Sequence, residues 1–122
     1  KSYLAAHKLS PKVIHGVLAV SGVYDLNVGD FQSSVFGSGV NERRDASPLA
    51  HVAAGAPPFK LMFCEHDYFT LPAQARMFHR VLSRAGVKSE LVYIPRENHI
   101  SEMLSFASES DFIVEQALEF MR

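Results

Sequence analysis

The chain has 122 residues, of which 48% are hydrophobic and 20% are charged, a composition that supports a buried core and argues against disorder. Twelve Lys and Arg residues face 13 Asp and Glu residues, so the net charge of −1 gives no general attraction to nucleic acids or anionic membranes. No apolar run approaches the roughly 20 residues that a membrane-spanning helix needs. The single cysteine, Cys64, cannot form an internal disulfide or anchor a structural zinc site.

The chain starts with Lys1 rather than Met and has no signal-like beginning. We therefore expect it to begin within a longer protein, in which case a missing targeting segment carries no information. A cytoplasmic location is the favoured expectation. By length, the chain is one small domain or a piece of a larger one.

Three short apolar segments are expected to form β-strands. Residues 13–20 are rich in β-branched side chains and read as a strand that is buried on both faces. Residues 59–64 repeat this pattern, and residues 90–94 form a third strand that Pro95 is expected to end. Residues 22–58 are interrupted repeatedly by Gly, Asn and Ser and predict an irregular region, with one helical turn from Ser47-Pro48 to His51.

The clearest helix is predicted over residues 72–85, with Thr70 as its N-cap and Gly86 as its C-terminal cap. A short helix over 100–106 and a last helix capped by Ser110 are expected to follow. The apolar stripe of the 72–85 helix consists of Leu71, Ala75, Phe78, Leu82 and Ala85, widened by Met77 and Val81. The apolar face of the last helix consists of Ile113, Val114, Ala117, Leu118 and Met121.

Strands that alternate with a helix predict right-handed crossovers and a parallel sheet. The expected fold class is therefore α/β, with about three parallel strands and flanking helices. Three such strands alone make a poor domain, because both faces and both edges of the sheet need cover. Residues 1–122 show no internal repeat and no linker, so they are treated as one partial domain.

Two polar side chains follow neighbouring strands at the points where functional groups gather in parallel sheets. Asp67 comes directly after the second strand, and His99 comes a few residues after the third. An Asp and a His in these places can form an orienting carboxylate and a general base. The alternative, which the spacing leaves equally open, is that Asp67 caps its helix and His99 is a surface-loop residue.

No serine in the chain has the G-x-S-x-G context of a hydrolase nucleophile. Ser21 follows a strand and precedes Gly22, but no Gly lies two positions before it, so it is disfavoured as a nucleophile. Cys64 with His66 is another candidate nucleophile and base, although a buried, inert thiol is the more frequent state of a single Cys. The remaining histidines show no metal-ligand spacing, and no nucleotide-binding motif occurs.

Four stretches resemble the C-terminal half of an α/β-hydrolase of the esterase/lipase branch, which includes kynurenine formamidase-like and feruloyl-esterase-like enzymes. They occupy residues 20–26, 46–49, 58–67 with Pro72 and Gln74 after them, and 90–100, in that order. The first resembles the exit of strand six, and the second resembles the end of a cap-like insertion. The third resembles strand seven with its acid loop, and the fourth resembles strand eight with its histidine loop.

The resemblance implies that Asp67 is the catalytic acid and His99 the catalytic base. The family usually has Gly where this chain has Cys64, and often Asp where it has Glu65, which makes Glu65 a minor rival to Asp67. The serine nucleophile and the oxyanion motif are then expected upstream of Lys1. The complete enzyme is expected to hydrolyse a small acyl ester or an arylformamide without a metal or an organic cofactor, whereas the chain alone is expected to be inactive.

Two other functions stay open at this point. The chain is also consistent with a non-catalytic α/β module that binds a partner, and with a hydrolase that uses Cys64. Neither nucleic acid nor a membrane is an expected partner. In the resembled architecture residues 13–20 form an internal strand, so in this chain they are expected to lie along an open edge. We therefore expect the chain to self-associate or to pair with the missing N-terminal half.

Overall fold

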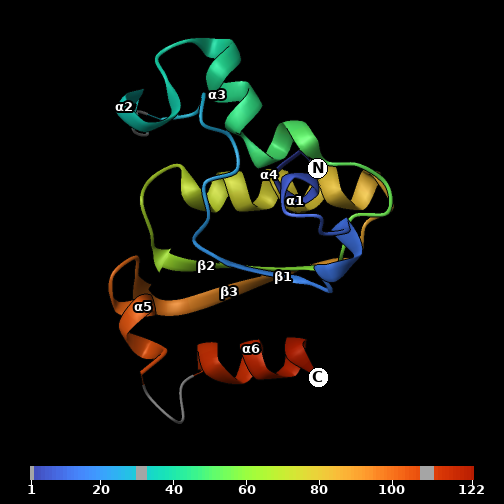
Figure 1. Ribbon diagram of the computed structural model, residues 1–122. Coiled ribbons are helices and arrows are strands. Elements are labelled where there is room, and N and C mark those ends of the chain that lie inside the picture. The colour runs from blue at the N-terminus through green and yellow to red at the C-terminus, as the bar shows by residue number, and fades with distance from the viewer. Residues whose placement is uncertain (1, 30–32, 108–111) are drawn as a thin grey trace.

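The computed structural model describes residues 2–29, 33–107 and 112–122. At its centre is a three-stranded parallel sheet made of β1 (Val17–Val20), β2 (Phe59–His66) and β3 (Ser89–Asn98), in the order β1-β2-β3. Helix α4 (Leu71–Arg84) lies on one face of the sheet, and α6 (Phe112–Met121) lies on the other (Figure 1). The predicted α/β class with parallel strands and flanking helices is therefore confirmed. No helix among the described residues is long and apolar enough to cross a membrane.

Strand β2 is buried on both faces of the sheet, as its continuous apolar run predicted. Its side chains alternate between two cores: Leu61 and Phe63 pack on the α4 side, whereas Met62 and Cys64 pack on the α6 side with Ile113. The α4-side core contains Tyr24, Leu61, Phe63, Ala75, Phe78, Leu82 and Val87. The α6-side core contains Met62, Cys64, Val92, Ile94 and Ile113. The central strand thus joins both layers of the fold.

Strand β1 is shorter than predicted, because residues 13–16 do not belong to it. Pro11–Val13 form a 3₁₀ turn, in which the hydroxyl oxygen of Ser10 accepts a hydrogen bond from the amide of Lys12 at 3.3 Å. Pairing with β2 begins where Val17 aligns with Phe59. Val13 is 51% exposed, so the expectation of burial along the whole run was wrong at its start.

Helix α4 confirms the main apolar stripe, since Leu71, Ala75, Phe78 and Leu82 are each at most 2% exposed. Met77 does not widen the stripe, because it is 46% exposed. The predicted caps differ in outcome. Thr70 precedes the helix but makes no side-chain capping bond, whereas Gly86 has a φ of +72°, the left-handed conformation that favours glycine after a helix.

Strand β3 does not end before Pro95, contrary to the prediction, and continues to Asn98. Proline is tolerated here because β3 is an edge strand, in which an N–H group on the side away from β2 has no ladder partner to lose among the described residues. The register between β2 and β3 shifts between Cys64 and His66, after which His66 aligns with Asn98. The register shift lies directly before Asp67, and β3 ends at Asn98, directly before His99.

The region over residues 22–58 contains more helix than expected. The structure adds α2 (Ser33–Phe36) and α3 (Val40–Ala46), and the predicted turn is present as η2 (Pro48–His51). At the start of α3, the Glu42 carboxylate accepts a hydrogen bond from the Gly39 amide at 3.1 Å, a cap that the sequence analysis missed.

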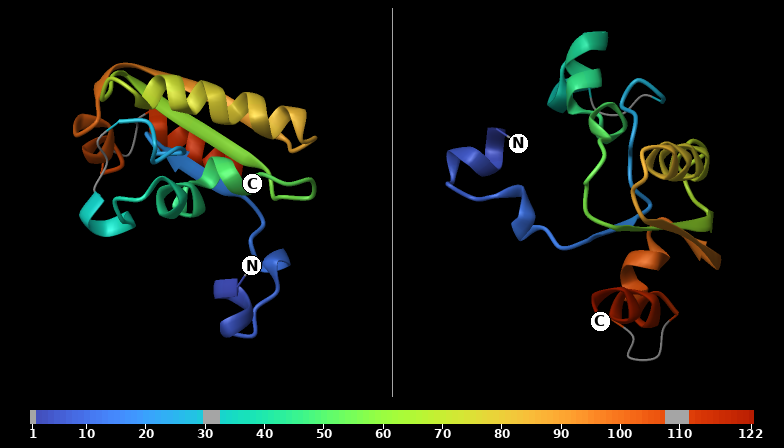
Figure 2. Two further views of the ribbon diagram at one scale, coloured as in Figure 1. Left: turned by 90° about the horizontal axis from the view of Figure 1, so that it is seen from above. Right: turned by 90° about the vertical axis from the view of Figure 1, so that its right-hand side faces the viewer.

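The two ends of the chain leave the sheet differently. α1 (Ser2–Ala6) lies away from the sheet, beyond the N-terminus of β1, as Figure 2 shows. α5 (Ser101–Ser105) follows β3 and confirms the predicted short helix. In α6, Ile113 and Ala117 are buried but Leu118 and Met121 are exposed, so that stripe is narrower than predicted. The predicted cap at Ser110 lies outside the described residues.

Lys60, a buried residue of the central strand β2, links the sheet to α6 through its ammonium group. Its side chain is 1% exposed, and its Nζ atom lies 3.2 Å from a Glu90 carboxylate oxygen and 3.4 Å from one of Glu119. It also donates a hydrogen bond to the side-chain oxygen of Gln116 at 3.0 Å. These three acceptors compensate for the removal of the ammonium group from water.

Candidate active site

The carboxyl ends of all three strands bring polar side chains to one end of the sheet. Ser21 follows β1, Asp67 follows β2 and His99 follows β3, while Glu102 comes from α5. Because the strands are parallel, residues far apart in sequence meet there. The candidate active site consists of these four residues, with Cys64 beneath them.

Asp67 and His99 are in direct contact, as predicted. The Nδ1 atom of His99 lies 2.9 Å from Oδ1 of Asp67, and the side chains are 32% and 0% exposed respectively. A carboxylate can only accept a hydrogen bond, so this contact places the ring proton on Nδ1 and leaves Nε2 able to take a proton. The juxtaposition is what an orienting acid and a general base require. The catalytic role of the two residues stays a prediction.

The surroundings hold this pair in place. The Tyr68 amide donates a second hydrogen bond to Oδ1 of Asp67 at 2.9 Å. The Tyr68 ring packs at an angle against the imidazole of His99, with 4.7 Å between the ring centroids. Among the described residues, no hydroxyl group is within hydrogen-bond distance of Nε2 of His99. That nitrogen is therefore free to accept a proton from a serine hydroxyl.

Ser21 has a role that the sequence analysis missed. Its hydroxyl donates a hydrogen bond to Oδ2 of Asp67 at 2.5 Å, which commits it to the acid rather than to His99. Its backbone φ is +44°, in the left-handed region that costs a non-glycine residue about 1–2 kcal/mol. The expectation that Ser21 is not the nucleophile agrees with this geometry. The position of Ser21 after β1 was the one available signal.

Replacing Ser21 should separate its hydrogen bond from its backbone strain. Ser21→Ala removes a bond to a charged group and should lower the free energy of unfolding by about 1.5–3 kcal/mol. Ser21→Gly removes the same bond but relieves the left-handed backbone, so it should be less destabilising than Ser21→Ala. Urea denaturation followed by circular dichroism measures both variants. Equal stability of Ser21→Ala and the unaltered chain would contradict the assigned contact.

The alternative candidates for the nucleophile and the acid, which are Cys64 with His66 and Glu65, are placed unfavourably for catalysis. Cys64 is 0% exposed, and burial raises the pKa of its thiol to about 12, which keeps it protonated and inert. Its sulfur lies 3.9 Å from the Ser21 hydroxyl, and His66 is exposed, so the two do not form a nucleophile–base pair among the described contacts. Glu65 is exposed and accepts a hydrogen bond from the Arg96 amide at 2.8 Å, which lowers the pKa of its carboxyl. It is not a rival to Asp67 for His99.

Glu102 is the second residue that the sequence analysis missed. It is 0% exposed, and neither carboxyl oxygen has a hydrogen-bond partner among the described residues. Its Oε1 atom lies 3.6 Å from Nδ1 of His99, the same nitrogen that contacts Asp67. Burial is the main cause that raises the pKa of this carboxyl, and the charge of Asp67 raises it further. Nothing in the sequence distinguishes Glu102 from an exposed acid near a helix start.

Comparison with known sequences adds a family. A sequence model described as the prolyl oligopeptidase family (Peptidase_S9) matches residues 3–121. Among curated proteins, none shows significant similarity to the chain.

Solved structures of one bacterial esterase share the fold. Esterase 2 of Thermogutta terrifontis phosphoramylated by tabun is 21% identical, with a TM-score of 0.70 over 94% of this chain and 41% of that chain. The same esterase phosphonylated by cyclosarin gives a TM-score of 0.68 at 21% identity, again over 94% and 41%. Its native form gives 0.63 at 18% identity, over 88% and 40%. The chain therefore spans about two fifths of the length of the esterase structures that it matches.

Proposed function

Because the chain belongs to the prolyl oligopeptidase family, we propose that it supplies the catalytic acid and base of a serine hydrolase that cleaves carboxylic esters. The observation that carries the proposal is the 2.9 Å contact between Nδ1 of His99 and the buried Asp67. The fold shared with an esterase over most of this chain supports the same reading. The serine is assigned to sequence that precedes Lys1, outside the 122 residues.

In the proposed reaction, His99 transfers the proton and Asp67 orients His99. Nε2 of His99 takes the proton of the attacking serine and then gives it to the departing alcohol. Asp67 holds the ring with Nδ1 protonated and stabilises the imidazolium that forms, while Ser21 and the Tyr68 amide fix the carboxylate. Without a nucleophile the covalent route is closed, so the 122-residue chain alone is inactive.

The substrate is proposed as a small acyl ester, with an arylformamide as the narrower option that the kynurenine formamidase-like resemblance supports. The family description also names a peptidase. The solved structures are titled as an esterase. Hydrolysis of a p-nitrophenyl ester, an arylformamide and a prolyl peptide by the complete protein would distinguish these classes. A non-catalytic binding module would hydrolyse none of them.

Replacing His99 tests the proposal directly. His99→Ala in the complete protein should lower kcat for p-nitrophenyl acetate by at least about 10³-fold, because the general base is lost. His66→Ala is the matched control, since His66 is an exposed histidine at the end of β2. Initial rates under substrate saturation measure the effect. Full activity in His99→Ala would overturn the proposal.

We also propose that the isolated chain self-associates through β1. Within the described residues, β1 pairs with β2 alone, so its outer N–H and C=O groups line an open edge. Sedimentation velocity of the purified chain should therefore show species larger than a monomer of 13.5 kDa. A monomer that stays soluble at high concentration and melts cooperatively would contradict this expectation.

A further inference from the structure

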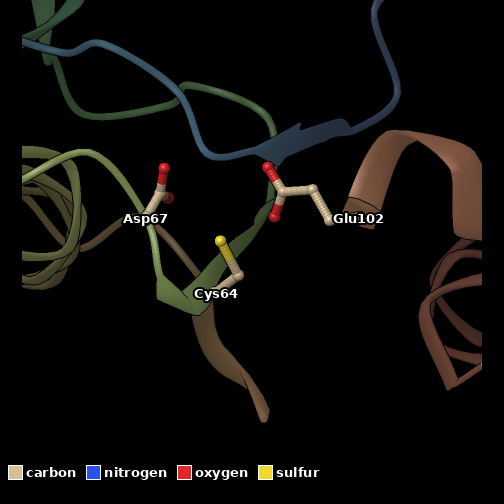
Figure 3. Close-up of side chains that lie close together, drawn as sticks. All are labelled: Cys64, Asp67 and Glu102. Atoms are coloured by element: carbon tan, nitrogen blue, oxygen red, sulfur yellow. The ribbon is translucent and has the colours of Figure 1, made fainter. Parts of the chain in front are cut away.

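Two residues of the candidate active site and the cysteine beneath it form a buried group of metal-ligating side chains. The thiol of Cys64 and one carboxyl oxygen each of Asp67 and Glu102 lie within 4.8 Å of one another. Figure 3 shows the three side chains converging from β2, the loop after it and the start of α5. The sequence analysis expected no metal site, because the histidines show no metal-ligand spacing. The parallel sheet and α5 bring the three side chains together.

Glu102 is the observation that points to a ligand within this group. Its carboxyl group is fully buried and is aimed at Cys64 and Asp67. Neither of its oxygens has a hydrogen-bond partner among the described residues, and Oε1 lies 3.6 Å from Nδ1 of His99. A buried carboxyl group without a hydrogen bond is costly, and a bound cation is one way to compensate it.

We propose that Cys64, Asp67 and Glu102 form a site for a thiophilic divalent cation, of which Zn²⁺ is the physiological example. One thiolate sulfur and two carboxylate oxygens suit Zn²⁺, whereas Mg²⁺ and Ca²⁺ prefer oxygen ligands alone. The ligands of a tetrahedral Zn²⁺ lie about 3.3–3.7 Å apart, given its bond lengths, so shifts of about 1 Å close the site. The Ser21 hydroxyl, 2.5 Å from Oδ2 of Asp67 and 3.9 Å from the sulfur, offers the fourth ligand.

Binding of the cation requires that the Cys64 thiol lose its proton. A metal ion binds the thiolate form of cysteine, so binding displaces the thiol proton of Cys64 into solvent. Because Asp67 is shared, the metal also withdraws negative charge from the carboxylate that accepts the hydrogen bond of Nδ1 in His99.

The test uses the 122-residue chain and Co²⁺ as a spectroscopic substitute for Zn²⁺. One equivalent of Co²⁺ should produce a thiolate-to-metal charge-transfer band, which Zn²⁺ then removes by displacement and excess Mg²⁺ does not. Cys64→Ser should abolish the band. Calorimetric titration with Zn²⁺ should show at least about tenfold weaker binding in Glu102→Gln, because even outer-shell changes cost that much. Glu65→Gln, an exposed acid on the same strand, is the matched control and should bind as the unaltered chain does.

Two further readouts guard against variants that fail to fold. Circular dichroism shows whether each variant is folded. The charge-transfer band is also measured in the unaltered chain, where no substitution can disturb folding. In a ¹⁵N-resolved NMR spectrum, Zn²⁺ should change the Nδ1 resonance of His99 while leaving that of His51 unchanged. The proposal is overturned if Co²⁺ gives no thiolate band at one equivalent, or if folded Cys64→Ser binds Zn²⁺ with unchanged affinity. Neither result depends on esterase activity, so the proposed function is tested separately.

Discussion

Replacing Asp67 by Asn in the complete enzyme should lower kcat about 10⁴-fold, because the amide no longer holds His99 in the tautomer that leaves Nε2 free. The expected loss follows from the burial of this carboxylate and its 2.9 Å contact with Nδ1 of His99. Saturation kinetics with p-nitrophenyl acetate measures it. KM should change little, because Asp67 is assigned to orient the base rather than to bind substrate.

Glu65→Gln is the control for this prediction. Glu65 lies two residues before Asp67, but it is exposed and its carboxylate accepts a hydrogen bond from the Arg96 amide. It should therefore keep full activity. If Glu65→Gln lost activity and Asp67→Asn retained it, the assignment of the acid would be reversed.

Replacing Phe78 by Ala should lower the free energy of unfolding by about 3–5 kcal/mol. Phe78 is 2% exposed, stacks on Tyr24 with 4.4 Å between ring centroids, and meets Phe59 edge-on at 5.6 Å. Truncation removes both ring contacts and leaves a cavity between α4 and the sheet. Urea denaturation of the 122-residue chain, followed at 222 nm by circular dichroism, measures the change.

Met77→Ala provides the comparison on the same helix. Met77 precedes Phe78 but is 46% exposed, so its truncation should cost less than about 1 kcal/mol. Similar losses for the two variants would mean that the helix does not present its Phe78 face to the sheet.

Periodicity predicted the parts of this fold in which burial is local to one element. The stripe through Ala75, Phe78 and Leu82 could be read because α4 packs along its whole length on one sheet. Strand β2 could be read because both of its faces are covered. The same approach failed at Val13 and Pro95. Whether β1 starts at residue 13 or 17, and whether β3 tolerates a proline, depends on which neighbour each strand has.

The candidate site was predictable to the extent that strand topology determines it. Asp67 and His99 follow consecutive strands, and their meeting required only that the strands be parallel and adjacent. Ser21 and Glu102 were not predictable in their roles. The contact of Ser21 with Asp67 depends on a left-handed backbone, and the burial of Glu102 depends on how α5 turns beneath the loop of His99. Neither feature produces a periodic pattern in the sequence.

The proline in β3 makes the two borders of the sheet unequal. Along β1, Val17 and Ser21 donate to carbonyl groups on the β2 side, so Leu18 and Val20 between them turn their N–H and C=O groups outward, whereas Pro95 removes a donor from the border formed by β3. A sheet that can grow at both borders propagates into a filament, because each added copy exposes a fresh template. A sheet that can grow at β1 alone stops once two copies have paired across a two-fold axis. The position of one imino acid thus favours closed assembly over fibrous polymerisation.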